Sequence, residues 1–152
     1  PADEFVANFV GKHRIWSSPE FIKIADIMIE NPVTCREDQS ALYCLERMRR
    51  TKVDSLLVVE PGSGLLKGIV RGKAIVPERD LHKPAAELMQ TDFLYLKPED
   101  NILTALKLVN ENHVANVPVI NEFRHLVGLV TTSTLVTTLS QQYAPNMEVA
   151  NA

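Results

Sequence analysis

The stretch Val53-Asp-Ser-Leu-Leu-Val-Val59 has a counterpart 61 positions further along the chain, Val114-Ala-Asn-Val-Pro-Val-Ile120. Both are short apolar runs of the kind that forms a buried β-strand. Beyond these runs, the closing Gly68-Ile-Val70 is matched by Gly128-Leu-Val130, and Met28 is matched by Met89. Because several separate segments keep nearly the same spacing, the sequence predicts two copies of one structural unit.

Each copy is predicted to run strand, helix, strand, turn, strand. The apolar residues of the two helices recur at helical spacing. They are Leu42, Leu45 and Met48 in the first copy, and Ile102, Ala105, Leu106 and Val109 in the second. Asp38 and Asp100 precede these helices and are predicted to cap them. The leading strand of the second copy is predicted at Phe93-Leu-Tyr95.

The repeat sets the predicted domain boundaries. Residues 19–76 and 85–140 form the two copies, joined by a charged, proline-bounded linker at 77–84 and followed by a flexible tail at 141–152. One copy is too small to bury its own sheet, so two copies are expected to pack sheet to sheet. The predicted fold class is therefore α/β (α+β), with two pseudo-symmetric βαββα repeats.

Composition excludes several classes of function. A net charge of −3 provides no basic field for nucleic acid, and no apolar run approaches bilayer length, so no direct membrane insertion is expected. The amino terminus does not resemble a signal peptide, and a start at Pro1 suggests a fragment or a processed chain. Two cysteines are too few for a disulfide framework, and Cys44 is predicted to be a buried thiol in a reducing cytoplasm. No metal site and no catalytic residue is predicted, because the histidines are scattered and no nucleophile has a base at plausible spacing.

The pattern over roughly residues 20 to 140 resembles the CBS domain, and two in tandem resemble the module called a Bateman domain. The segment from Pro1 to Arg14 resembles the sequence that follows the nucleotide-binding domain in ATP-binding subunits of osmoprotectant ABC importers, which take up glycine betaine, carnitine or choline. This resemblance implies that residues 1–18 are a linker helix from an ATPase domain. It also implies ATPase and membrane subunits as partners, and a cytoplasmic location at the inner face of the membrane.

The resemblance further implies an adenosine-containing regulatory ligand, such as AMP, ATP, S-adenosylmethionine or cyclic di-AMP, and no cofactor. Nucleotide-binding CBS repeats end in Gly-x-hydrophobic-Thr-x-x-Asp. The second copy keeps Thr131 but has Thr134 in place of Asp, and the first copy has Arg71, Lys73 and Ala74 in this region. The two threonines are predicted either to contact phosphate or to cap a helix. Arg71 and Lys73 are either phosphate ligands or a solvated helix start.

The loss of both carboxylates favours a different site. Tandem CBS modules often form a disc-shaped homodimer, parallel or antiparallel, and a two-fold symmetric ligand such as cyclic di-AMP suits its axis. Tyr95 stands where the first copy has the smaller Thr34, next to Val33, and is predicted to stack on adenine or to be a half-buried strand aromatic. Leu108 is predicted to face the ligand or a dimer partner. Glu111 is a further candidate. The first-copy residues that match Leu108 and Glu111 are Arg47 and Arg50, and these two arginines either balance phosphate charge or are solvated.

The leading hypothesis is therefore a regulatory module that senses an adenine nucleotide and controls an importer ATPase. The alternatives are a purely structural dimerisation module without ligand, and an AMP- or ATP-sensing CBS pair of another protein.

Overall fold

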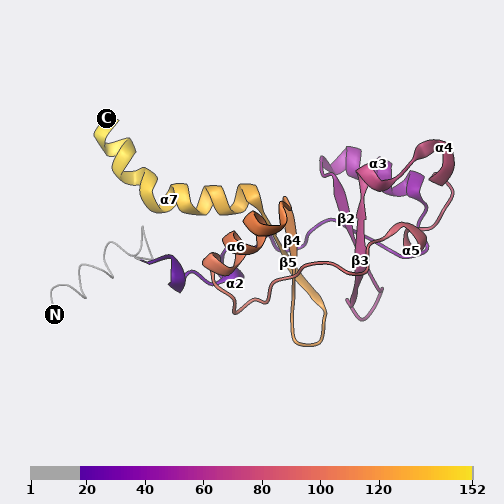
Figure 1. The fold of residues 1–152 in the computed structure, drawn as a ribbon, viewed down its shortest axis with the longest axis horizontal. Helices are drawn as coiled ribbons and strands as arrows, with labels where there is room; N and C mark the ends of the chain where they lie inside the picture. The colour runs from indigo at the N-terminus through magenta and orange to yellow at the C-terminus, as the bar shows by residue number, and fades with distance from the viewer. Residues whose placement is uncertain (1–17, 152) are drawn as a thin grey trace. The chain divides into compact units, whose positions relative to one another are not determined.

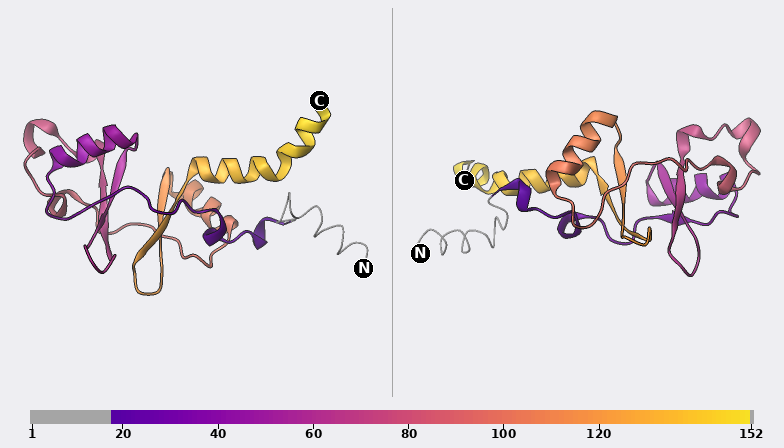
Figure 2. Two further views of the ribbon diagram at one scale, coloured as in Figure 1. Left: turned by 180° about the vertical axis from the view of Figure 1, so that it is seen from behind. Right: turned by 60° about the horizontal axis from the view of Figure 1, so that its bottom comes forward.

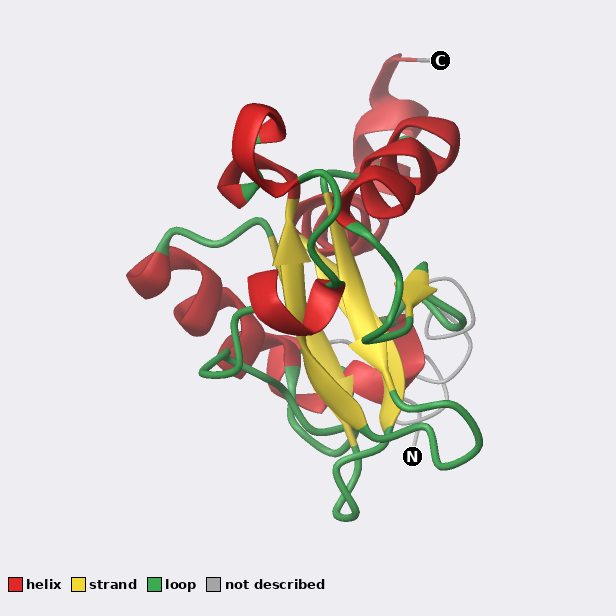
Figure 3. Ribbon diagram, turned by 90° about the vertical axis from the view of Figure 1, so that its right-hand side faces the viewer, coloured by secondary structure: helices red, strands yellow, loops and turns green. Residues whose placement is uncertain are grey.

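A computed structural model describes residues 18–151 of the chain and the side chains as far as Gln141 (Figure 1). Helices and loops make up most of the chain, and the strands are short (Figure 3). The contacts divide the chain into two compact units. The first-repeat unit consists of residues 30–95 and 118–128, and the second-repeat unit of residues 18–29, 96–117 and 129–151.

The first-repeat unit contains a three-stranded sheet in the order β1-β2-β3. The strands are β1 (Thr34–Cys35), β2 (Ser55–Val59) and β3 (Leu66–Arg71). β1 runs parallel to β2, and β2 runs antiparallel to β3. The helical elements are α3 (Ala41–Thr51), η2 (Gly72–Ala74), α4 (Pro77–Asp80) and α5 (Ala85–Leu88). α3 packs against β2, α5 and η2, so the predicted strand–helix–strand order of the first copy is confirmed.

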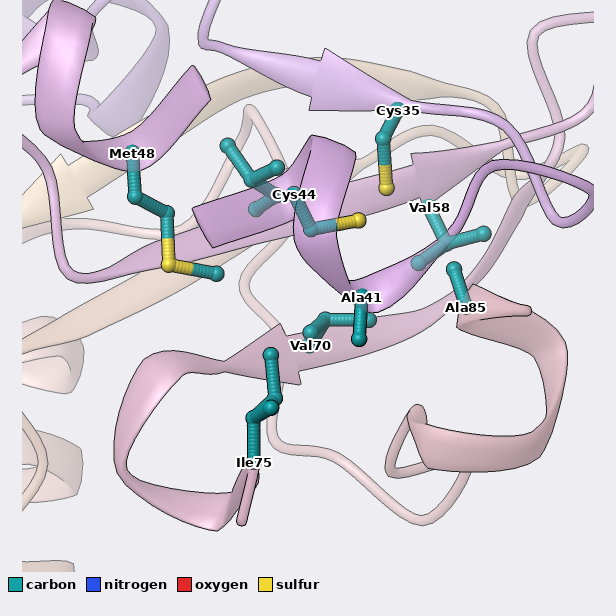
Figure 4. Close-up of a cluster of buried hydrophobic side chains, with 9 residues drawn as sticks. Cys35, Ala41, Cys44, Met48, Val58, Val70, Ile75 and Ala85 are labelled. Atoms are coloured by element: carbon teal, nitrogen blue, oxygen red, sulfur yellow. The ribbon is translucent and has the colours of Figure 1, made fainter. Parts of the chain in front are cut away.

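The core of this unit lies between α3 and the sheet (Figure 4). Cys44, Leu56, Val58 and Val70 are completely buried there, which confirms the buried thiol predicted at Cys44. A hydrogen bond with Cys44, and after it burial, raise the pKa of the Cys35 thiol, which also lies in this core. The other members of the cluster are Ala41, Met48, Ile75 and Ala85.

The buried face of α3 differs from the predicted one. Ala41, Cys44 and Met48 point into the core, whereas Leu42 is 41% exposed. The prediction of Leu42 as a core residue was wrong because small residues carry part of the buried face. A pattern search that looks for large apolar side chains misses them.

The helix caps are also different residues. Ser40 Oγ accepts a hydrogen bond from the Tyr43 N–H at 3.1 Å, and Asn101 Oδ1 accepts one from the Thr104 N–H at 3.0 Å. The predicted caps at Asp38 and Asp100 were wrong. A capping residue must stand immediately before the first helical residue, and both aspartates lie too early. Asp38 instead forms an exposed ion pair with Arg36 at 3.0 Å.

The predicted linker at 77–84 contains helix α4 and a buried carboxylate. Asp80 is 0% exposed and bonds Arg79 Nε at 2.8 Å and Lys83 Nζ at 3.0 Å. It also accepts the Val76 N–H at 2.9 Å. The backbone of the same segment reaches α3, because the Ala41 N–H donates to the Lys83 carbonyl. Residues 77–84 are thus a hydrogen-bonded part of the first-repeat unit.

We expect Asp80→Asn to destabilise the protein in a pH-dependent way. The hydrogen bond from Arg79, and then those from Val76 and Lys83, hold the pKa of Asp80 well below its ordinary value. A carboxylate with a lowered folded-state pKa stabilises the protein fully above its unfolded pKa of about 3.9, and this stabilisation is lost as the pH falls further. Melting temperatures should therefore differ clearly between wild type and Asp80→Asn at pH 7, and the difference should narrow steadily as the pH falls below about 4. Asp38→Asn, in an exposed pair, should change little over the same pH range. A constant difference for Asp80→Asn across this range would contradict the assignment.

The second-repeat unit contains four helical elements: η1 (Pro19–Phe21), α2 (Ile24–Ile27), α6 (Ile102–Asn112) and α7 (Thr132–Asn151). α6 packs against η1 and α7. β4 (Asn116–Ile120) and β5 (Leu126–Thr131) form a hairpin, drawn in orange in Figure 2. By their contacts, residues 118–128 of the hairpin are assigned to the first-repeat unit and its other residues to this one. The predicted strand–turn–strand of the second copy is confirmed.

The two copies exchange their leading segments, which the sequence boundaries did not predict. Ile29 bridges Leu129 and Lys23 bridges Asn101, so residues 18–29 belong with the second copy. The pairs Gln90–Ile69 and Pro84–Ser40 are the same bridges at the matching positions of the other copy. The repeat predicted from the sequence therefore extends to the backbone pairing within each unit.

Further findings concern single segments. The strand predicted at Phe93-Leu-Tyr95 does not form. In the first copy the Leu57 N–H donates to the Val33 carbonyl and so helps to hold β1, but the matching position in the second copy is Pro118, which has no N–H. Helix α7 continues to Asn151 and so includes most of the segment at 141–152 that was predicted as a flexible tail. The linker helix predicted at 1–18 lies, apart from Ser18, outside the described residues.

Candidate ligand-binding clefts

A cavity of about 440 Å³ opens in the second-repeat unit, and we call it the threonine cleft. Its size lies within the range of small-molecule sites. α2 and the residues after it form one wall, and the end of β5 with the start of α7 forms the other. The lining residues are Asp26, Ile27, Ile29, Thr131, Ser133, Thr134, Thr137, Thr138 and Gln141.

Two of the predicted ligand residues, Thr131 and Thr134, lie together in this cleft. Thr131 Oγ1 accepts the Thr134 N–H at 3.0 Å, and the two hydroxyl oxygens are 2.9 Å apart. Thr131 therefore caps the start of α7, the alternative that the sequence left open. Because one hydroxyl donates to the other, a single hydroxyl hydrogen of the pair stays available to a ligand.

The matching region of the first copy is basic. Arg71 ends β3, and its Nε donates to Gln90 Oε1 at 3.5 Å. Gln90 is the counterpart of Ile29. Arg71 therefore reaches the segment that corresponds to the wall of the threonine cleft formed by α2 and the residues after it. Lys73 is exposed in η2. The two copies thus present different charges at equivalent places.

A second cavity, of about 280 Å³, lies in the first-repeat unit beside β1. It is lined by Asn31, Pro32, Thr34, Val59, Gly64, Leu126 and Val127. Arg47 Nε donates to the Thr34 carbonyl at 2.9 Å, so this guanidinium is anchored to β1. Arg47 was predicted as either a phosphate partner or a solvated side chain, and the bond to β1 gives it a structural contact that neither alternative included.

Tyr95 presents an aromatic surface in the first-repeat unit. Its side chain is 40% exposed, and the guanidinium carbon of Arg124 lies 5.3 Å from its ring centroid. This distance is typical of a cation–π contact. Val33 lies partly buried against the core. Arg124 was not predicted, since its position in the β4–β5 turn gives no sequence signal that it reaches Tyr95.

The other candidates from the sequence lie on helices. Leu108 is half-buried and Glu111 is exposed on α6, in the second-repeat unit. Arg50 is exposed on α3, in the first-repeat unit. A ligand site on the axis of a homodimer that includes these residues stays a prediction.

Two other features are absent from the described part of the chain. Residues 18–151 hold no group of three or more His, Cys, Asp or Glu side chains placed to bind a metal ion. Over the same residues, no helix has the length and apolar character needed to cross a membrane.

Two repeats, each built on a helix followed by a hairpin and paired with the leading segment of the other repeat, define a tandem-repeat module of mixed helices and strands. The CBS domain family matches this chain twice, at residues 24–78 and 85–141. The protein therefore belongs to the CBS domain family, as the sequence pattern predicted.

The similar proteins include subunits of importers. The glycine betaine/carnitine/choline transport ATP-binding protein OpuCA of Bacillus subtilis is 32% identical over 90% of this chain and 36% of its own length. The choline transport ATP-binding protein OpuBA of the same organism is 34% identical with the same coverage. The chain thus spans about a third of the length of these relatives. The predicted resemblance to such ATP-binding subunits is confirmed.

Solved structures agree with this fold. The structure of Staphylococcus aureus OpuCA matches with a TM-score of 0.64 and 25% identity, over 75% of this chain and 96% of that one. The structure of CBSX2 in complex with AMP matches with a TM-score of 0.71 and 20% identity, over 79% of this chain and 97% of that one.

Proposed function

We propose that this chain is the regulatory module of an osmoprotectant ABC importer and that it controls the importer ATPase by binding an adenine nucleotide. The similarity to OpuCA and OpuBA over 90% of the chain supports the importer context. The AMP complex of CBSX2 and the ATP complex of the cytosolic domain of MgtE, which share this fold, support the class of ligand. Control of an ATPase requires that the ligand binds one conformation of the importer better than another.

We further propose cyclic di-AMP as the ligand, bound on the axis of a homodimer. The observation that carries this proposal is the exposed ring of Tyr95 with Arg124 against it. An aromatic ring that is held in place by a cation–π contact offers a surface on which a purine base can stack. A two-fold symmetric ligand would meet two such rings, one from each copy of the chain.

Tyr95→Ala is expected to weaken cyclic di-AMP binding by roughly 5- to 150-fold, the range for loss of one stacked base. Tyr95→Phe should keep most of the affinity because it keeps the ring. Phe123→Ala provides a matched control, since Phe123 is an exposed aromatic of the same unit that the proposal does not use. Isothermal titration of the wild type and the three variants measures these affinities.

Titration with AMP and ATP tests the ligand itself. Micromolar AMP binding together with no binding of cyclic di-AMP would contradict the axial site. If none of the three nucleotides raises the melting temperature, the proposed role as a nucleotide sensor is contradicted and a purely structural dimerisation module is favoured.

A further inference from the structure

The cavity of about 280 Å³ beside β1, which we call the β1 cavity, lies on the face of the first-repeat sheet that is turned away from α3. Cys35 and Val58 belong to the core cluster beneath α3, whereas their strand neighbours Thr34 and Val59 line the cavity. Successive side chains of a strand point to opposite faces of a sheet, so the cavity and the α3 core lie on opposite sides of β1 and β2. The β1 cavity shares no described lining residue with the threonine cleft.

The turn of the first hairpin contributes Gly64 to the cavity, and its counterpart in the second hairpin is Arg124, 60 positions later. Both residues have a positive φ, +80° at Gly64 and +64° at Arg124. Their carbonyls accept reciprocal hydrogen bonds, Gly64 from the Leu126 N–H and Arg124 from the Leu66 N–H, each at 3.0 Å. The two positions are therefore equivalent in the backbone as well as in the sequence.

The second copy carries large side chains at the positions where the β1 cavity has small ones. Thr34 corresponds to Tyr95, 61 positions later, and Gly64 corresponds to Arg124. Tyr95 and Arg124 are in contact, with the guanidinium carbon 5.3 Å from the ring centroid. The β1 cavity thus stands, in the first copy, at positions that an aromatic ring and a guanidinium occupy in the second.

The space beside Gly64 is open. A Cβ added at this residue would meet no atom beyond its chain neighbours within 4 Å. The cavity volume of about 280 Å³ exceeds the roughly 150 Å³ of an apolar cavity that holds benzene. A molecule of one aromatic ring, or of two fused rings, therefore has the size that fits.

The described lining of the cavity is uncharged and includes two polar side chains. The Asn31 amide and the Thr34 hydroxyl make no hydrogen bond within the part of the chain that the structure describes, so both can donate to a ligand and accept from it. The main-chain groups of Gly64 are already bonded, to the Glu60 carbonyl and to the Leu126 N–H. A charged ligand would find no ionic partner among these residues. The remaining side chains of the lining are apolar: Pro32, Val59, Leu126 and Val127.

We propose that the β1 cavity binds an uncharged aromatic molecule of one or two rings, with its ring beside Thr34 and Gly64 and a hydroxyl or ring N–H group bonded to Asn31 or Thr34. The ring takes the place in the first copy that the Tyr95 ring holds in the second. This site is separate from the nucleotide site proposed at Tyr95 and does not depend on it.

The probe for this site is 4-methylphenol, the side chain of tyrosine as a free molecule, and titration of the whole chain followed by amide NMR measures its binding. We expect saturable binding in the millimolar range or tighter, with shifted signals of Thr34, Gly64 and Val127. Thr34→Tyr should abolish this binding, because the new side chain fills the cavity as Tyr95 fills the matching place. Thr51→Tyr, the same substitution at an exposed position of α3, should leave the binding unchanged.

A second variant keeps the test decisive if Thr34→Tyr does not fold. Asn31→Gly/Thr34→Val removes both polar groups, retains a residue suited to the φ of +56° at position 31, and should weaken binding roughly 2- to 10-fold. No saturable binding to the wild type, binding that survives Thr34→Tyr, or an unchanged affinity in the double variant would each overturn the proposal. Tyr95→Ala should leave 4-methylphenol binding intact. Loss of binding in Tyr95→Ala would mean that the probe stacks on Tyr95, which would also overturn the assignment to the β1 cavity.

Discussion

Leu56→Ala is expected to lower the free energy of unfolding by about 2–5 kcal/mol, the range for a fully buried leucine. Leu56 is 0% exposed at the start of β2, and it belongs to the cluster that joins the sheet to α3. Its removal leaves a cavity that cannot close, because Val58 and Val70 are fixed in paired strands. Urea denaturation measures the change as a lower midpoint with an unchanged slope.

Leu42→Ala is the matched control for this prediction. The substitution is chemically identical, but Leu42 is 41% exposed on the first turn of α3. Since it removes little buried surface, we expect a loss below about 1 kcal/mol. Equal losses for the two variants would mean that α3 presents a different face to the sheet.

The repeat and its buried strands could be predicted from the sequence, because a strand that is buried along most of its length must be apolar at nearly every position. β2 and β4 show this directly, with Leu56 and Val119 completely buried at their respective strands. The faces and starts of the helices were harder to predict. Leu42 and Ala41 are neighbours, and only the packing decides which of them is buried.

The exchange of leading segments could not be predicted, because backbone bridges such as Ile29–Leu129 depend on main-chain groups that every residue carries. The missing strand at Phe93-Leu-Tyr95 was in principle predictable. Pro118 stands in the second copy where Leu57 donates a hydrogen bond in the first, and proline cannot donate.

Some residues of the candidate sites could likewise be predicted from the sequence, and others could not. Thr131 and Thr134 could be found because a short motif carries them. Asp26 and Arg124 could not, since each reaches its site only through the fold: Asp26 faces the start of α7 across the threonine cleft, and Arg124 lies against Tyr95. A residue that acts across two distant segments leaves no local spacing to recognise.

Gly68→Ala is expected to lower the free energy of unfolding by about 1–3 kcal/mol, as overpacking of a tight interior does. A Cβ at Gly68 would lie 2.8 Å from the Gln90 carbonyl oxygen and 2.8 Å from Met89 Sδ. The neighbouring Ile69 exchanges two backbone hydrogen bonds with Gln90, so the exchanged segment would have to move away from β3. Thermal or urea unfolding of Gly68→Ala measures the loss, and Lys67→Ala, on the adjacent half-buried residue, controls for the strand itself.

A double variant separates the two contacts that cause this strain. The Met89 side chain is flexible and is removed in Met89→Ala, whereas the Gln90 carbonyl is backbone and stays in place. If the carbonyl dominates, Gly68→Ala should cost nearly the same free energy with Met89 as with alanine at position 89. If the cost disappears in the double variant, the Met89 side chain alone is responsible, and the backbone pairing of Ile69 with Gln90 tolerates a Cβ at position 68. A Gly68→Ala protein as stable as wild type would contradict the close approach of the exchanged segment to β3, on which the pseudo-symmetric pairing depends.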